Sequence, residues 1–142
     1  MFLVLYLIDK NKARWLALEN ASIKFFYNFD LEFGKDSLFE GLDTFLVKNK
    51  LELKSFSGLI LAVEDPSLTQ VKVATTMVNT LAWYFKWPVV GEYYFSGHLE
   101  DVLVKLSKDV SKLKKFTPLK VKYQRQPDIT ISKKRPNFRI KK

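Results

Sequence analysis

The chain has 142 residues, 47% hydrophobic and 15% aromatic, enough for one folded domain with a substantial core. It contains no cysteine and one histidine, which excludes a disulfide framework, a thiolate zinc site, a cysteine nucleophile and a histidine-rich metal centre. The formal charge is +9. Positive charge is concentrated in residues 112–142, where Asp128 is the only acid, whereas residues 1–111 contain slightly more acidic than basic residues. This asymmetry favours contact with a polyanion.

Residues 1–8 are continuously apolar, which predicts a buried central strand over 2–8. The segment lacks the basic flank and cleavage site of a signal peptide, and it is far shorter than the roughly 20 residues of a membrane-spanning helix. We therefore expect no membrane segment, and the absence of cysteine fits a cytoplasmic protein. Strands over 14–18 and 23–29 follow after short polar turns, which predicts an antiparallel meander of three strands.

The hydrophobic spacing then changes from the strand period to the helix period. A first helix is predicted over 36–48, with an apolar stripe of Leu38, Leu42, Phe45 and Leu46. Ser37 followed by Glu40 predicts a capping box at its start. A short apolar strand over 59–63 comes next. A second helix is expected from Ser67 or Thr69 to about Lys86, because Pro88 disfavours helical geometry in the residue before it.

A fifth strand begins at 89–91, and Leu99, Val102, Leu103 and Leu106 predict a third helix. The order βββ-α-β-α-β-α requires a mixed sheet, since the strand–helix–strand crossovers join parallel strands. This is the ribonuclease-H-like arrangement found as half of actin-like ATPase domains, although periodicity alone leaves other mixed α/β layouts open. We expect a domain over 1–111 and a basic C-terminal extension over 112–142. The extension is expected to dock near Pro118 to Tyr123 and to be free beyond Ser132.

Residues 59–91 carry a more specific pattern, an apolar strand and turn followed by a helix and a second short strand. The residues that matter are Ser67, Thr69, Lys72, Asn79, Leu81, Ala82 and Pro88 to Gly91. Two further matches are Ile8-Asp9 and the ending Pro118…Tyr123-x-Arg125-x-Pro127. This pattern resembles the bacterial TsaB family, the YeaZ-type proteins of tRNA threonylcarbamoyladenosine synthesis.

The resemblance implies an actin-like half-domain and a scaffolding role beside a TsaD-type subunit, which transfers a threonylcarbamoyl group to adenosine 37 of tRNA. It also implies that the first two helices pack against that subunit or against a second copy. The chain departs from the family in two ways. The glycine-rich turn before the second helix is replaced by a segment with Glu64 and Asp65. Only one helix fits between Gly91 and the tail, so we expect the second half of the family's fold to be missing or vestigial.

The residues do not predict catalysis. Glu64 and Asp65 suit the helix dipole but would repel a phosphate, and Ser67 and Thr69 are typical helix caps. Asp9 is followed by Lys10, which is more typical of a hairpin turn than of a metal-binding aspartate. We expect no cofactor, no metal and no enzymatic activity. The alternative, an enzyme of the actin-like ATPase or glycoprotease class, requires nucleotide binding.

The second helix has almost no charge between Lys72 and Lys86 and shows apolar residues on two neighbouring stripes. Such a helix is either buried on both sides or part of an interface. Cover by the tail or the third helix is the simpler alternative. We predict a partner interface formed by Leu38, Phe39, Leu42, Val73, Met77, Thr80 and Tyr84. The partner would be a TsaD-like subunit or a second copy.

The basic tail interleaves cations with aromatic residues, a pattern typical of nucleic-acid binding, although charge runs are more often only solvated. The RNA-binding candidates are Lys120, Lys122, Arg125, Lys133, Lys134, Arg135 and Arg139. They suggest contact with tRNA within a complex. They also support an alternative function, a stand-alone RNA-binding protein that acts through this tail.

Overall fold

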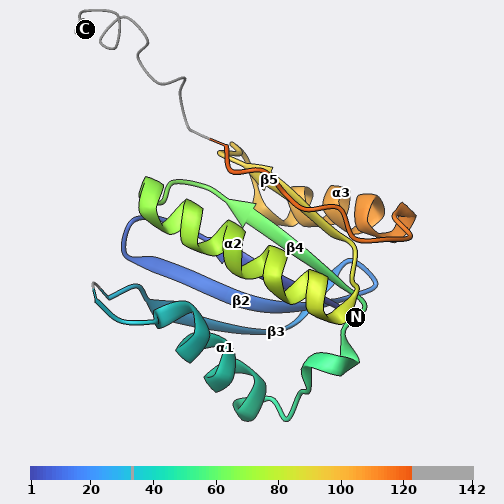
Figure 1. The fold of residues 1–142 in the computed structure, drawn as a ribbon, viewed down its shortest axis with the longest axis horizontal. Coiled ribbons are helices and arrows are strands. Elements are labelled where there is room, and N and C mark those ends of the chain that lie inside the picture. Colours follow the sequence, from blue (N-terminus) through green and yellow to red (C-terminus); the bar gives the residue numbers. More distant parts are fainter. Residues whose placement is uncertain (33, 123–142) are drawn as a thin grey trace, which may run out of the picture.

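The computed structural model describes residues 1–32 and 34–122, and it contains one mixed sheet of five strands in the order β3-β2-β1-β4-β5 (Figure 1). The strands are β1 (Phe2–Leu7), β2 (Lys12–Glu19), β3 (Ser22–Asp30), β4 (Gly58–Val63) and β5 (Val89–Tyr93). The first three strands are antiparallel neighbours, whereas β1 pairs in parallel with β4, and β4 with β5. The predicted meander and parallel pair are both confirmed.

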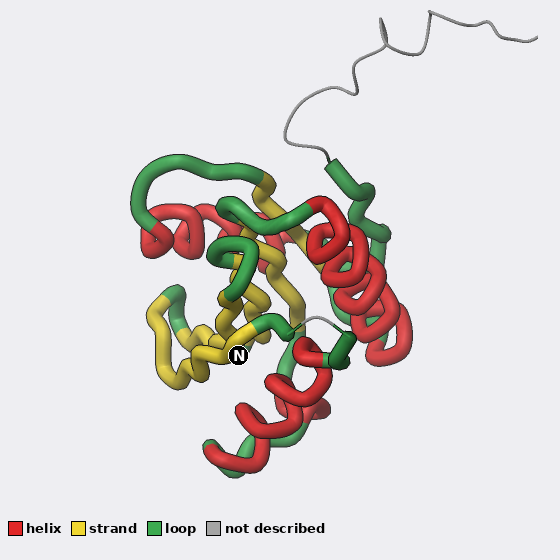
Figure 2. Tube along the Cα trace, turned by 90° about the vertical axis from the view of Figure 1, so that its left-hand side faces the viewer, coloured by secondary structure: helices red, strands yellow, loops and turns green. Residues whose placement is uncertain are grey.

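Helices cover both faces of this sheet (Figure 2). The helices are α1 (Ser37–Lys48), α2 (Leu68–Phe85) and α3 (Leu99–Lys112), with a short 3₁₀ turn at Leu53–Ser55. Helices α1 and α2 pack against one face and α3 against the other. The predicted α/β class is therefore confirmed. No helix in the described ranges is long and apolar enough to cross a membrane.

The sequence of each strand follows its place in the sheet. Strands β1 and β4 lie between two helical layers and are almost wholly apolar and buried. Strand β3 is an edge strand, and alternate residues are exposed along its whole length. Its Phe25, Tyr27 and Phe29 side chains pack against the α1 side, whereas Phe26 points to the opposite face and is exposed.

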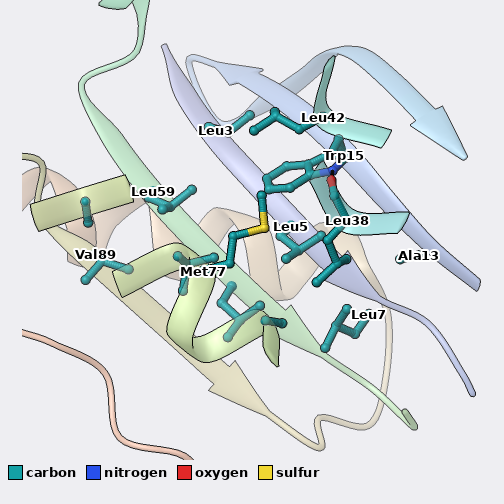
Figure 3. Close-up of a cluster of buried hydrophobic side chains, with 14 of the residues drawn as sticks. Leu3, Leu5, Leu7, Ala13, Trp15, Leu38, Leu42, Leu59, Met77 and Val89 are labelled. Atoms are coloured by element: carbon teal, nitrogen blue, oxygen red, sulfur yellow. Dashed lines mark hydrogen bonds between the residues drawn. The ribbon is translucent and has the colours of Figure 1, made fainter. Parts of the chain in front are cut away.

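The core between the sheet and the helices α1 and α2 is centred on Trp15 (Figure 3). The indole is fully buried, and its Nε1–H donates a hydrogen bond of 3.1 Å to the carbonyl oxygen of Leu38. Because an unpaired buried indole N–H would be costly, this bond fixes the first turn of α1 over β2. The position of α1 on the sheet therefore depends on a buried contact.

The helix ends confirm one predicted cap and correct another. The Ser67 hydroxyl accepts a hydrogen bond from the Gln70 backbone N–H at 3.2 Å, as expected for the cap of α2. At α1, the predicted capping box is wrong, because Asp36 holds the cap position without a side-chain bond. The Ser37 hydroxyl instead accepts from the Glu32 backbone N–H at 3.0 Å, which ties the preceding loop to the helix.

Candidate functional site

Helices α1 and α2 lie side by side on the same face of the sheet (Figure 1). A shallow groove runs between them. The α1–α2 groove has a volume of about 370 Å³. It is lined by Phe39, Lys72, Val73, Thr76, Met77 and Thr80. Lys72 is the only charged residue among them, so the groove presents mainly apolar and hydroxyl-bearing side chains to solvent.

The predicted interface residues divide into an exposed and a buried set. The exposed set comprises Phe39, Val73, Thr80 and Tyr84. Val73 has 48% of its surface exposed and Tyr84 has 70%, although both belong to residue types that are usually covered. These four side chains are available to a partner, and they lie on the outer faces of the two helices.

The buried set requires a correction. It comprises Leu38, Leu42 and Met77. More of the circumference of α2 is buried than one stripe of apolar residues, because this helix packs against the sheet beneath it and also faces α1. Met77 lies at the base of the groove and reaches the core beneath it, so it has only 4% of its surface exposed. A charge at Met77 would therefore destabilise the fold, and it cannot test association alone.

The chain after α3 returns along the opposite side of α2. The Asn79 amide makes two hydrogen bonds to the backbone of Leu119, of 2.9 Å to its carbonyl and 2.8 Å from its N–H. Farther along, the Tyr94 hydroxyl donates to the carbonyl of Lys122 at 2.8 Å. We call residues 116–122 the strap. It covers one flank of α2 and leaves the α1–α2 groove open.

Strand β5 is shaped to receive the strap. A Cβ atom at Gly91 would lie 3.1 Å from a methyl carbon of Leu119 and 3.3 Å from the carbonyl oxygen of Leu61. A larger residue would require Leu119 to shift, so glycine at this position favours a close approach of the strap to the strand. The apolar side chains of Phe116, Leu119 and Val121 pack against the core from this side. The first part of the predicted tail is thus integrated into the domain.

Two of the seven predicted RNA-binding residues lie in the described part of the chain. Lys120 and Lys122 lie on the strap with exposed side chains, and the Lys122 ammonium lies 5.8 Å from the centre of the Tyr93 ring. The other predicted RNA-binding residues lie outside the residues that the structure describes. They are Arg125, Lys133, Lys134, Arg135 and Arg139.

Sequence reasoning missed a second hollow, at the C-terminal end of α2. This lysine–aromatic pocket has a volume of about 560 Å³. It is lined by Trp83, Tyr84, Lys86, Lys114, Lys115 and Phe116. The pattern Lys114-Lys115-Phe116 was visible as part of the basic tail, but nothing in the sequence placed it beside the end of α2.

Two carboxylates near the ends of β1 and β4, those of Asp9 and Glu64, already accept hydrogen bonds. Asp9 accepts hydrogen bonds from the backbone N–H groups of Asn11 and Lys12, at 2.8 and 2.9 Å, which makes it a turn residue. Glu64 accepts a hydrogen bond from the Tyr6 hydroxyl. Burial and this carboxylate both raise the pKa of Tyr6. Within residues 1–32 and 34–122, no cluster of acidic and histidine side chains could hold a metal ion.

The comparisons with known proteins establish the fold. No protein-family model matches the sequence, and no curated protein matches it significantly. Among solved structures, YeaZ from Pseudomonas aeruginosa aligns over 65% of this chain and 43% of its own, with a TM-score of 0.54 and 15% identity. An uncharacterized protein with similarity to peptidase YeaZ, also from Pseudomonas aeruginosa, aligns over 65% of this chain and 42% of its own, with a TM-score of 0.55 and 15% identity.

At this identity the likeness concerns the fold, and it confirms the fold that the TsaB resemblance implies. The chain spans less than half the length of either structure. The similarity therefore confirms a mixed five-stranded α/β sheet with three helices, which this chain shares with part of both structures. What such proteins bind, and what they do with it, belongs to the proposals below.

Proposed function

We propose that this chain is a non-catalytic, TsaB-like scaffold subunit that binds a TsaD-type protein through the outer face of α1 and α2. In this role it would support the transfer of a threonylcarbamoyl group to adenosine 37 of tRNA by that partner. The observation that carries the proposal is the exposed apolar surface along these two helices, beside a YeaZ-like fold.

The composition of α2 supports a protein partner. A helix with a solvated outer face normally carries charged residues there. The outer face of α2 instead presents Val73, Thr76, Thr80 and Tyr84, and no charged residue occurs between Lys72 and Lys86. Apolar side chains that surround a groove between two helices are suited to receive a helix of another protein. Burial of such surface in a complex contributes about 25 cal/mol per Å² of apolar area.

A non-catalytic role is supported by the chemistry at the strand ends. A phosphate-binding turn uses backbone N–H groups at a helix N-terminus, usually approached through glycines. Here Glu64 and Asp65 precede α2, and the Ser67 hydroxyl occupies the cap. Negative charge at this position opposes nucleotide binding. A titration with ATP and Mg²⁺ tests this part of the proposal, and binding heat that saturates would contradict it.

The interface is tested by co-expressing the full chain with the TsaD-type subunit of the same organism. Val73→Glu places a charge on the outer face of α2, where 48% of the residue is already exposed. The monomer can hydrate this carboxylate, but the complex would bury it. We expect at least a tenfold loss of the co-purified subunit, because an unpaired buried charge costs several kcal/mol, of the order of 3–5 kcal/mol.

Val104→Glu is the matched control, since Val104 is 40% exposed and lies on α3, on the opposite face of the sheet. This variant should co-purify like the wild type. Equal retention of Val73→Glu and the wild type would refute the interface. A wild-type chain that forms only dimers of itself, and never holds the TsaD-type subunit, would refute the choice of partner while leaving the face as a site of self-association.

A further inference from the structure

We propose that the lysine–aromatic pocket binds a single-stranded stretch of nucleic acid, with a base stacked on Trp83 and phosphates paired with the surrounding lysines. The proposal goes beyond the scaffold function and does not depend on it. It also differs from binding by the basic tail alone, because one wall of the pocket, with Trp83, Tyr84 and Lys86, comes from the end of α2.

The pocket has two walls from distant parts of the chain. Trp83, Tyr84 and Lys86 come from the end of α2, whereas Lys114 and Lys115 directly precede the strap. Phe116 packs partly against the core, and the next hydrogen-bonded point of the strap is Leu119, held by Asn79. The second wall is therefore anchored to the same helix as the first. A volume of about 560 Å³ is sufficient for a nucleotide-sized group.

The aromatic part of the pocket is unusually open to solvent. Trp83 is 66% exposed, whereas the other two tryptophans, Trp15 and Trp87, are buried at 0% and 5% exposure. A large exposed indole has no role in the core of this domain. Base stacking on exposed aromatic side chains is the usual way in which proteins bind single strands, and it tolerates any base sequence.

The charges favour a nucleic acid over a protein as the occupant. The pocket contains three lysines and no acidic residue. In the described part of the chain, Lys86, Lys114 and Lys115 form no ion pair, and the four ion pairs found there involve other lysines. Protein interfaces are depleted in lysine. Nucleic-acid sites are rich in it, because each lysine that neutralises a phosphate releases a counterion.

The test is a fluorescence titration of the full chain with oligoadenylate of eight to ten nucleotides, as RNA and as DNA, near physiological ionic strength. Because Trp83 is the exposed tryptophan, stacking should quench the long-wavelength part of the emission and leave the buried indoles unchanged. Labelled oligonucleotides then report affinity for the variants. Trp83→Leu should weaken binding roughly 5- to 100-fold, the range of one lost base stack, whereas Trp83→Phe should retain most of it.

Matched controls separate the pocket from the charge of the whole chain. Phe26→Leu removes an exposed aromatic ring from β3, and Lys108→Ala removes an exposed lysine from α3; both should bind like the wild type. The double variant Lys114→Ala/Lys115→Ala should weaken binding and reduce its salt dependence by about two counterions. Circular dichroism shows that each variant is folded.

Several outcomes would overturn the proposal. Binding by Trp83→Leu equal to that of the wild type, with no quenching, would assign any affinity to the tail charge alone. Equal loss in Trp83→Leu and Trp83→Phe would exclude stacking as the cause. If both variants bind oligonucleotide normally but lose the TsaD-type subunit, the pocket is a protein contact instead.

Discussion

Tyr6 and Glu64 form a partly buried polar contact at the end of the two central strands. The tyrosine hydroxyl donates to the carboxylate, and the Tyr6 ring also lies 6.0 Å from that of Phe95. Burial, and then the neighbouring carboxylate, raise the pKa of Tyr6 in the folded chain. An acid whose pKa is raised by folding stabilises the fold only while it stays protonated.

This contact predicts a loss of stability in alkaline solution. In the unfolded chain a tyrosine ionises near pH 10, whereas in the folded chain Tyr6 stays protonated to higher pH. The free energy of unfolding should therefore fall as the pH rises above about 10, by at most about 1.4 kcal/mol per pH unit for one proton. Urea unfolding of the wild type and of Tyr6→Phe between about pH 8 and pH 11 measures this, and the variant should show the shallower fall.

Tyr84→Phe is the control, because it removes a hydroxyl from a side chain that is 70% exposed. Its unfolding should follow the wild type across the same pH range. Identical pH dependence of Tyr6→Phe and the wild type would contradict the role of Tyr6.

The two serines at the helix starts show which side-chain contacts the sequence could predict. The cap at Ser67 was predicted correctly, because a hydroxyl directly before a helix has a local partner, the backbone N–H three residues on. Ser37 had the same local pattern, yet its hydroxyl bonds to the Glu32 N–H in the preceding loop. Whether the Glu32 N–H lies near Ser37 depends on the path of the loop after β3, so the pattern of residues around Ser37 could not predict this bond.

At the scale of elements, α2 is the most informative segment. Its residue range and its shortage of charge were evident in the sequence. The sequence did not show how much of the circumference of α2 is buried. This depends on the sheet, on α1 and on the strap, which lie on different sides of the helix. For this reason the sequence placed Met77 on the outer stripe, whereas the structure buries it.

The partners of the strap were the hardest feature to predict. The basic extension was expected to dock near Pro118 to Tyr123 and to be free beyond Ser132. Residues 116–122 pack along α2 and β5, so docking is confirmed within the described residues, although the sequence did not indicate which elements would receive it. The contact pairs residues 40 positions apart, Asn79 and Leu119, so periodicity could not reveal it. Deletion from residue 112 would remove the strap together with the charge, and it would expose part of the core.

The Asn79 contact predicts a specific effect of its removal. Asn79→Ala abolishes both hydrogen bonds to Leu119, so the free energy of unfolding should decrease by about 1–3 kcal/mol. Local release of the strap should also expose Lys120 and Lys122 to trypsin. Limited proteolysis at low trypsin concentration, followed by mass spectrometry, measures cleavage after these lysines.

Thr80→Ala provides the control on the same helix, because the Thr80 hydroxyl bonds only to the Thr76 carbonyl one turn earlier. Cleavage after the strap lysines should stay at the wild-type rate in this variant. Faster cleavage in both variants would show general loosening of α2, and no change in Asn79→Ala would exclude the strap anchor.

At the scale of the whole molecule, the domain has two unlike helical faces. Helix α3 has charged residues along its exposed side and suits contact with water. On the opposite face, the side chains of Phe39, Val73 and Tyr84 are exposed to solvent. The fold class followed from the order of elements, and the resemblance predicted which helices would meet a partner. Which side chains remain available on that face could be read only from the packed structure.

The central claim is that this apolar face binds a TsaD-type subunit. The most direct measurement is isothermal titration of that purified subunit with the full chain and with Val73→Glu, at a protein concentration where both chains are folded. The account predicts saturable binding by the wild type, with a negative heat-capacity change from buried apolar surface, and at least tenfold weaker binding by the variant. Absence of wild-type binding, or equal affinities for the two chains, would contradict it.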